Sequence, residues 1–506
     1  AGEIAGFGRH VQAIIRTPRS RGEGTYAILP DKPEPPSRLT RPEGSCCPPV
    51  VAQSRCRGAL CRCCPVSVDA SISGYTVPIH TQSTLNDGLL HTMILCGIND
   101  VQPGAVLGAL VTDPQIPDHA LLRPGVALDA SILTSLRKRG VTQLWLEDDL
   151  TGDLDSAVAP QLNAARMEVF ANLRDGLAAC ARGTLAVASI TECRRAVMGM
   201  VIEAISSAKY ASMTDAVFSA AGQASHGSNV AYLSLLTGLH VENYIVSEQT
   251  RLDREQARDM SVLGLAGLLH DLGKTRLPPA AASHHELLTH NGTSAPPQYL
   301  DHTTIGKSIL EDGRAPARVA YTVLNHHQRF DGSGWPDLGP ITGGRINGPL
   351  AGRAIHVFAR VVAAANVLDN LRSDADGAHL PSVAALAAFA SSRYDGWFDP
   401  VIRRALLLRI PPFAIGTDVR LSDGRRAIVQ APTLCDPCRP VVRILEHKAR
   451  EPEVIDLHAQ PALRITHSLG QDVTKYHYEV PPEAVAPAPA AEPAAEKAAA
   501  ALVPAK

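Results

Sequence analysis

GLAGLLHDLGK, residues 264–274, is an apolar segment that abruptly places a histidine beside an aspartate. The apolar residues predict a buried helix. Successive side chains on a helix differ by about 100°, so His270 and Asp271 can reach one side of a pocket from different angles. Lys274 follows three residues after Asp271 and four after His270, which places all three on one helical face. The stretch therefore predicts a core helix that delivers three reactive side chains to one site.

A second polar cluster lies downstream in NHHQRFDGSGWP, residues 325–336. His326 and His327 stand side by side just before a loop with two glycines and a proline. An apolar core has no use for such a pair, and a solvated surface gains little from it. The pair is therefore interpreted as functional.

Two further histidines open helical runs, His226 in HGSNVAYLSLLTGL and His302 in HTTIGKSIL. Each of them alone is more often a hydrogen-bonded residue at a helix end than a ligand. The His270–Asp271 couple alone fits a structural hydrogen bond equally well.

Taken together, these residues form a candidate metal-ligand set: His226, His270, Asp271, His302, His326 and His327. Burying so many ionisable groups without a metal would leave several imidazoles competing for few partners. Imidazole nitrogen and carboxylate oxygen suit transition ions, with iron or manganese favoured and zinc or nickel as alternatives. The sequence thus predicts a metal centre in a helical domain.

The chain has 506 residues, enough for about three domains. The predicted fold class is mainly α: an all-helical domain with a small α+β unit before it, a small β-rich, barrel-like unit after it, and disordered ends. The predicted segments are a disordered Cys/Pro/Arg-rich segment at 1–68, an α+β module at 69–150, a helical connector at 151–210, a helical domain at 211–410, a β domain at 411–475 and a disordered Ala/Pro-rich tail at 476–506.

The two flanking units have recognisable elements. VLGALVTD and VTQLWLE are typical of strands, and DASILTSLRKRG between them predicts a helix capped by Asp129 and ended by Gly140. TDVRLSDGRRAIVQ predicts a hairpin that turns at Asp423 and Gly424, followed by the strands PVVRILE and EVIDL.

Composition narrows the class of partner. The net charge of −2 argues against a nucleic-acid polymer, and the 4% aromatic content argues against base-stacking platforms. No apolar run approaches the ~20 residues of a membrane span, and no secretory leader is recognisable. The expected compartment is the cytoplasm, without a membrane partner.

Other chemically active residues are interpreted as structural. Six cysteines crowd into residues 1–68 without paired spacing, and Cys435 and Cys438 have no second pair nearby, so neither set is a strong zinc site. His284, His285 and His290 are predicted to be solvated in a loop.

HDLGK followed by HHQRFDGSGWP resembles the HD-GYP domain, a branch of the HD metal-dependent phosphohydrolases. The likeness covers about 211–410, and the flanking units resemble modules often joined to such domains. The resemblance implies a centre with two, sometimes three, metal ions, usually iron or manganese. It also implies hydrolysis of cyclic di-GMP, a bacterial second messenger, to the linear dinucleotide or to GMP.

Carried over by position, the six residues of the candidate set match the family's metal ligands. Asp271 is expected to lie between two ions, and Lys274 to meet a substrate phosphate, so both are the predicted catalytic residues. Trp335 stands for the tyrosine of the DGxGYP signature and is expected either to stack on a guanine or to pack in the loop. The loop is also the expected contact for a diguanylate cyclase or another signalling protein, and a homodimer is considered.

Several positions depart from the family pattern. ANVLDNL places Asn366 where the family has an aspartate ligand, with Asp369 as the second acidic position. Arg372 is the candidate replacement for a missing Arg-Pro-Tyr segment that grips the nucleotide. Gly222 replaces a glutamate associated with a third metal, so two ions are expected.

These departures keep three functions open. The first is a metal-dependent cyclic di-GMP phosphodiesterase. The second is a catalytically degenerate regulator that binds a nucleotide or protein without cleaving it. The third is a hydrolase of the same type acting on another nucleotide, since a fold does not by itself determine function.

Overall fold

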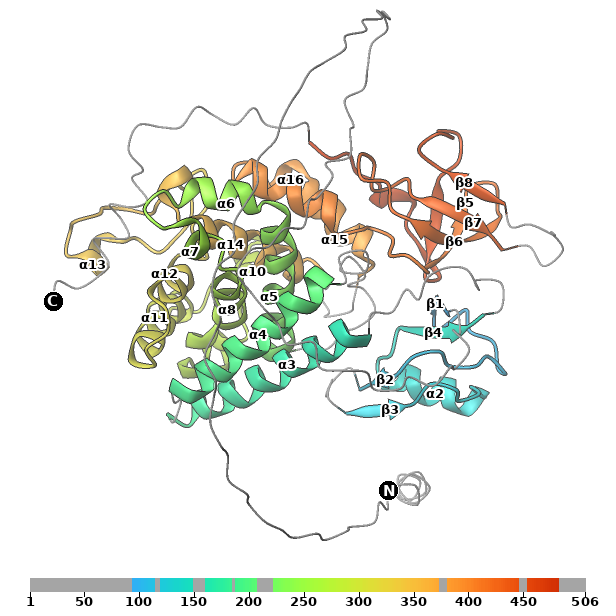
Figure 1. Cartoon of the computed structure of the whole chain (residues 1–506), viewed down its shortest axis with the longest axis horizontal. Helices are drawn as coiled ribbons and strands as arrows, with labels where there is room; N and C mark the ends of the chain where they lie inside the picture. Colours follow the sequence, from blue (N-terminus) through green and yellow to red (C-terminus); the bar gives the residue numbers. More distant parts are fainter. Residues whose placement is uncertain are drawn as a thin grey trace, which may run out of the picture. The chain divides into compact units, whose positions relative to one another are not determined.

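The computed structural model describes residues 93–113, 119–148, 160–183, 187–206, 222–372, 380–445 and 453–481 (Figure 1). The segment predicted at 1–68, with its six cysteines, lies outside these residues. So does the predicted tail at 476–506, except for its first six residues.

The first described unit contains two small antiparallel strand pairs and a helix. Its elements are β1 (Met93–Gly97), β2 (Val111–Thr112), β3 (Ala120–Leu122), α2 (Ala130–Lys138) and β4 (Gln143–Glu147). β1 pairs with β4, and β2 pairs with β3. Asp129 Oδ1 accepts a hydrogen bond from the Ile132 N–H at 2.7 Å and so caps α2. β1 was not recognised in the sequence, and VLGALVTD forms a strand only over its last residues.

The main unit is helical and begins with two long helices, α3 (Pro160–Ala181) and α4 (Val187–Ser206), which pack on each other. The helices that carry the site residues are α5 (Gln223–His240), α8 (Met260–Leu269), α11 (His302–Asp312), α12 (Ala317–Asn325) and α14 (Val357–Asn370). The shorter helices and turns are α6 (Glu242–Glu248), α7 (Arg254–Ala257), η4 (Leu272–Arg276), α9 (Pro279–Ala282), α10 (Glu286–His290), η5 (Tyr299–Asp301), α13 (Gly339–Thr342), η6 (Gly352–Ala354), α15 (Ser382–Ala390), η7 (Ser392–Tyr394) and α16 (Pro400–Arg409).

Helix α8 is the centre of this unit. Every residue from Met260 to Leu269 is buried, as expected for a helix that is apolar on all sides. It packs against α4, α5, α12 and α14, and their apolar side chains form one continuous core with it. The predicted core helix is therefore present, but it ends at Leu269, and the chain continues as the 3₁₀ turn η4. The expectation that one α-helix would carry His270, Asp271 and Lys274 is thus wrong.

The last unit is an antiparallel sheet in the order β10-β9-β5-β6-β7-β8. Its elements are β5 (Asp418–Leu421), β6 (Arg426–Ala431), β7 (Val441–Ile444), β8 (Val454–Asp456), β9 (Ile465–Ser468), β10 (Gln471–Asp472) and η8 (Thr474–Tyr476). β5 and β6 form the hairpin predicted around Asp423 and Gly424. The mainly helical fold with a carboxyl-terminal sheet is confirmed. The barrel-like closure is not, because among the described strands β8 and β10 remain at opposite edges.

Among the helices described, none combines the length and the apolar character that crossing a bilayer requires.

Candidate metal centre

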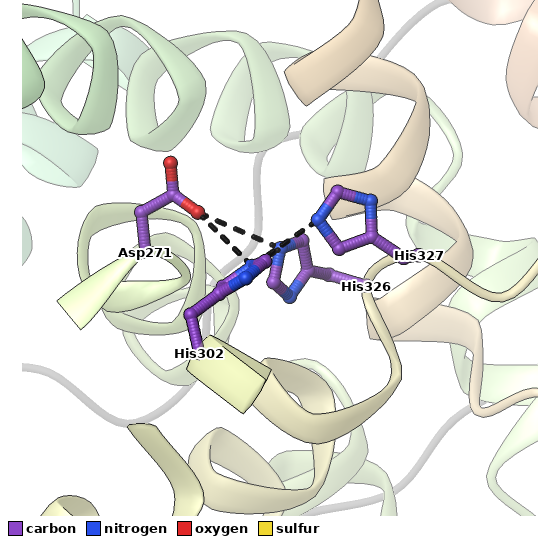
Figure 2. A group of neighbouring side chains, drawn as sticks. All are labelled: Asp271, His302, His326 and His327. Carbon is purple, nitrogen blue, oxygen red and sulfur yellow. Dashed lines mark hydrogen bonds and ion pairs between the residues drawn. The ribbon is translucent and has the colours of Figure 1, made fainter. Parts of the chain in front are cut away.

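Six side chains from four places in the sequence meet in the helical unit. His226 lies in the first turns of α5, and His270 and Asp271 lie where α8 passes into η4. His302 begins α11, and His326 and His327 follow the end of α12. Their ligand atoms form two groups: the first group is Asp271, His302, His326 and His327, and the second group is His226, His270 and Asp271. Figure 2 shows the first group, with the imidazoles and the carboxylate turned toward one another.

Asp271 belongs to both groups because its two oxygens point in different directions. Oδ1 lies 3.4 Å from His302 Nε2 and 3.8 Å from His326 Nε2. Oδ2 lies 3.5 Å from His270 Nε2 and 3.8 Å from His226 Nε2. The carboxylate therefore stands between the two groups, and its expected place between two ions stays a prediction.

Close backbone packing brings the two halves of the first group together. A Cβ atom on Gly273 would lie 1.9 Å from the carbonyl oxygen of His302, so only glycine allows η4 to pass α11 at this distance. The glycine of HDLGK thus brings Asp271 within reach of His302.

Three histidines are oriented by backbone carbonyls three residues before them. The Nδ1–H groups of His270, His302 and His326 donate to the carbonyls of Gly267, Tyr299 and Val323 at 2.8, 2.6 and 2.7 Å. A carbonyl can only accept, so Nδ1 carries the proton, and in the neutral ring Nε2 presents a lone pair to the site.

The other two histidines are oriented by carboxylates. His327 Nδ1 donates to Glu286 Oε2 at 2.9 Å, and His226 Nδ1 donates to Asp369 Oδ2 at 2.8 Å. Glu286 also accepts from Arg329 Nε and Nη2, at 3.0 and 2.6 Å. Such outer carboxylates are typical of metal-binding histidines because they set the tautomer and raise the basicity of the ring.

Burial and neighbouring charges keep the ligands of the first group in the protonation states that can bind a metal. Burial lowers the pKa of His302 to about 4 and holds the pKa values of His326 and His327 well below their usual range, so these rings are neutral at pH 7. Burial raises the pKa of Asp271, but the Lys274 ammonium and His270 outweigh it and hold that pKa well below its usual range. The first group therefore combines three neutral imidazoles with one ionised carboxylate.

The donor set of the first group fits a cation. His302 Nε2 is 3.5 Å from His326 Nε2 and 3.3 Å from His327 Nε2, although nitrogens that both carry lone pairs cannot hydrogen-bond to each other. Asp271 Oδ1 is buried and has no hydrogen-bond partner in the described part of the chain. A cation shared by these atoms removes both problems, and imidazole with carboxylate suits a transition ion.

Asn366 lies at the second group. Its Oδ1 is 3.0 Å from His226 Nε2 and accepts a hydrogen bond from Asn370 Nδ2 at 2.9 Å. In a neutral ring that donates from Nδ1 to Asp369, Nε2 would meet the amide oxygen with a lone pair as well. The position is consistent with the predicted ligand role of Asn366, which stays a prediction.

The predicted substrate-binding residues differ in where they lie. Lys274 Nζ forms an ion pair with Asp271 Oδ2 at 2.8 Å, inside the centre. Trp335 stacks on His327, with ring centroids 4.0 Å apart and planes at 15°, so a base would have to use its other face. Arg372 is buried with Nη1 4.0 Å from Asp369 Oδ1, which makes it first of all a neighbour of that carboxylate. Substrate contacts by all three stay predictions.

The DGSGWP loop folds back onto the paired histidines. The Trp335 N–H donates to the His327 carbonyl at 3.2 Å, and a Cβ atom on Gly334 would lie 2.5 Å from that same oxygen. The glycine before Trp335 is therefore required for the tryptophan to reach His327.

Sequence reasoning missed two residues and misplaced one. Glu286, which orients His327, belongs to no recognisable sequence motif. Neither does Tyr299, whose ring centroid lies 5.1 Å from that of His302. The prediction that His284 is solvated is wrong: it is 4% exposed, and its ring packs on Tyr299 because α9 and α10 fold against the centre.

Residues 241–402 match the profile of the HD domain family, a range that contains five of the six candidate ligands and leaves out His226. The chain is 28% identical over 335 residues to the cyclic di-GMP phosphodiesterase PA4108 of Pseudomonas aeruginosa, covering 61% of this chain and 74% of that protein. It is 31% identical over 183 residues to the cyclic di-GMP phosphodiesterase response regulator RpfG of Xanthomonas campestris pv. campestris, covering 36% of this chain and 43% of that protein.

Two solved structures are also similar. Bd1817, an HDG"Y"P protein from Bdellovibrio bacteriovorus, matches with 17% identity and a TM-score of 0.37, over 62% of this chain and 98% of that one. The HD domain of the phosphodiesterase PgpH from L. monocytogenes matches with 15% identity and a TM-score of 0.24, over 36% of this chain and 88% of that one.

Proposed function

We propose that the helical unit of this chain, in which residues 241–402 match the HD domain family, is a metal-dependent phosphodiesterase that hydrolyses a cyclic dinucleotide. Cyclic di-GMP is the proposed substrate, with the linear dinucleotide or GMP as product. The similarity to two cyclic di-GMP phosphodiesterases supports this choice.

One observation carries the proposal. The two oxygens of Asp271 face two separate groups of imidazole nitrogens, each with its lone pair directed inward. This arrangement suits two divalent ions that share one carboxylate, and iron and manganese are the proposed ions. When bound, such ions would supply Lewis acidity and activate water for phosphoester hydrolysis.

The protein's own residues would hold and orient the substrate. Lys274 Nζ, 2.8 Å from Asp271, brings a positive charge to the place where a phosphodiester would meet the centre. An ammonium there would offset the charge that builds up on the phosphoryl oxygens during hydrolysis. The hydrogen bonds to Gly267, Tyr299 and Val323 keep three imidazoles from turning away.

Turnover of cyclic di-GMP by protein loaded with Fe(II) or Mn(II) tests the proposal. We expect conversion to linear dinucleotide or GMP, followed by chromatography, and its loss in His270→Ala. His119→Ala, which changes an exposed histidine in the first unit, is the matched control and should keep full activity. Absence of turnover with every divalent ion tried would exclude the function.

A binding-only regulator is the second candidate, and Asn366 favours it. An amide oxygen carries no net charge and holds a hard cation less tightly than a carboxylate does. With Asp271 as the one carboxylate of the second group, that group is short of negative charge. Such a protein would bind a nucleotide without cleaving it.

Asn366→Asp separates the two candidates. We expect the carboxylate to tighten metal binding at the second group by about tenfold or more, since it adds an anionic ligand beside His226. Competition with a graded chelator measures the affinity. Turnover that appears only in Asn366→Asp would identify the natural protein as the regulator, whereas turnover in both would identify an enzyme.

A further inference from the structure

The hydroxyl of Tyr299 is the feature of the centre that no role described so far explains. The side chain is 2% exposed, and its hydroxyl has no hydrogen-bond partner within the described ranges. A buried phenol without a partner costs free energy, so such a group calls for an explanation. By contrast Tyr244, in the same unit, donates its hydroxyl proton to Asp399 Oδ2 at 2.7 Å.

The ring of Tyr299 forms part of the wall of the first group. Its centroid lies 5.1 Å from that of His302, 6.2 Å from that of His327 and 5.6 Å from that of Trp335. Its backbone carbonyl accepts the Nδ1–H of His302, which ties the residue to the centre at a second point.

A positive charge lies over the same ring. Lys274 Nζ is 5.6 Å from the Tyr299 ring centroid, while the ammonium pairs with Asp271. A phenolic hydroxyl has a proton to donate in a hydrogen bond, and the ammonium over the same ring is a second donor.

We propose that the Tyr299 hydroxyl donates a hydrogen bond to a phosphoryl oxygen of the phosphodiester, next to the Lys274 ammonium. A phosphate group offers several acceptor oxygens, so one group can satisfy both donors. Tyr299 is then a substrate-binding residue, and this role rests on the proposed function of the centre.

Tyr299→Phe tests the role because it removes only the hydroxyl. Inorganic phosphate is the probe, titrated calorimetrically into the metal-loaded full chain. A hydrogen bond to a charged acceptor corresponds to roughly tenfold to hundredfold in affinity, so we expect Kd for phosphate to rise by that factor. Metal content should stay at the level of the natural protein. The melting temperature of the metal-free variant should stay equal or rise, since an unpaired buried group is lost.

Tyr321→Phe is the matched control. The Tyr321 hydroxyl is also buried without a partner in the described chain, but its side chain packs in a separate apolar cluster with Leu324, Leu338 and Leu350. Its removal should leave Kd for phosphate unchanged.

The outcomes separate this inference from the proposed function. An unchanged Kd for phosphate in Tyr299→Phe would overturn the inference. The partner of the hydroxyl would then be a bound water instead of the substrate. Loss of metal in that variant would also overturn it, because the residue would then act through His302. If instead Kd rises as expected while the natural protein turns over no cyclic dinucleotide, the inference stands and the substrate assignment fails.

Discussion

At the scale of single residues, Asp271 and the imidazoles around it differ in how many of the two ligand groups each belongs to. Both oxygens of Asp271 face ligand nitrogens, whereas His226 belongs to the second group alone and His327 to the first group alone. A residue shared by two positions should matter for both, and a residue on one side for that side only.

Metal content of purified variants checks this difference. We expect Asp271→Asn, which keeps the shape and removes the charge, to lose metal from both positions. His226→Ala and His327→Ala should each lose metal from one position and keep the other. Elemental analysis of protein loaded under identical conditions gives the ratio directly, and an Asp271→Asn protein with unchanged content would contradict a bridging carboxylate.

At the scale of elements, α10 supports the centre from outside through Glu286. Because Glu286 holds His327 and neutralises Arg329, we expect Glu286→Gln to weaken metal binding at the first group by about 10- to 100-fold. Chelator competition measures the change. Glu311→Gln is the control: Glu311 pairs with Lys307 on the exposed side of α11, where an ion pair contributes little. Equal effects of both variants would rule out a positioning role for Glu286.

Helix α14, which carries Asn366 and Asp369, starts at a histidine cap that depends on pH. His356 Nδ1 accepts the Phe358 N–H at 3.1 Å, which only the neutral ring can do. Burial, followed by the charges of Arg360 and Arg318, lowers the pKa of His356 to about 3. The unfolded chain, with a histidine pKa near 6.5, therefore binds this proton first as the pH falls. The contribution of the cap to the free energy of unfolding is complete above about pH 6.5 and declines below it.

His356→Asn keeps an acceptor at the cap and cannot titrate. We therefore expect the free energy of unfolding of the natural protein to fall more between pH 7 and pH 5 than that of His356→Asn. Urea unfolding at the two pH values measures these free energies. An equal decrease in both proteins would show that His356 is not the cause of the pH dependence.

At the scale of the whole molecule, bound metal should cross-link segments that are far apart in the sequence. The two groups join side chains from α5, α8, α11 and α12, which are separated by up to about a hundred residues along the chain. An ion that binds only the folded state stabilises it by about 2.7 kcal/mol when its free concentration is one hundred times Kd. Chelation should thus lower the melting temperature of the natural protein. The melting temperature of Asp271→Asn should not change with the chelator. If that of the natural protein does not change either, bound metal does not stabilise the fold.

The sequence alone predicted which side chains meet at the centre and the mainly helical type of fold. Residue types and their positions along helices were sufficient to select the six candidate ligands and Lys274, because ligand chemistry is a property of the side chain itself. The buried helix α8 followed from its uninterrupted apolar run, and the hairpin of β5 and β6 from its turn residues. Two local predictions failed, the α-helical register through Lys274 and the solvated His284, because each depended on contacts with segments far away in the chain.

Tertiary structure alone decided how the ligands are oriented and what surrounds them. Spacing along a helix determines which residues share its face, but the crossing of η4 over α11 at Gly273 brings Asp271 to His302. The carboxylate of Glu286, the buried hydroxyl of Tyr299 and the stacking of Trp335 on His327 likewise arise where separate elements meet. Side-chain chemistry is local, whereas the direction of a lone pair depends on packing between segments that the order of residues does not specify.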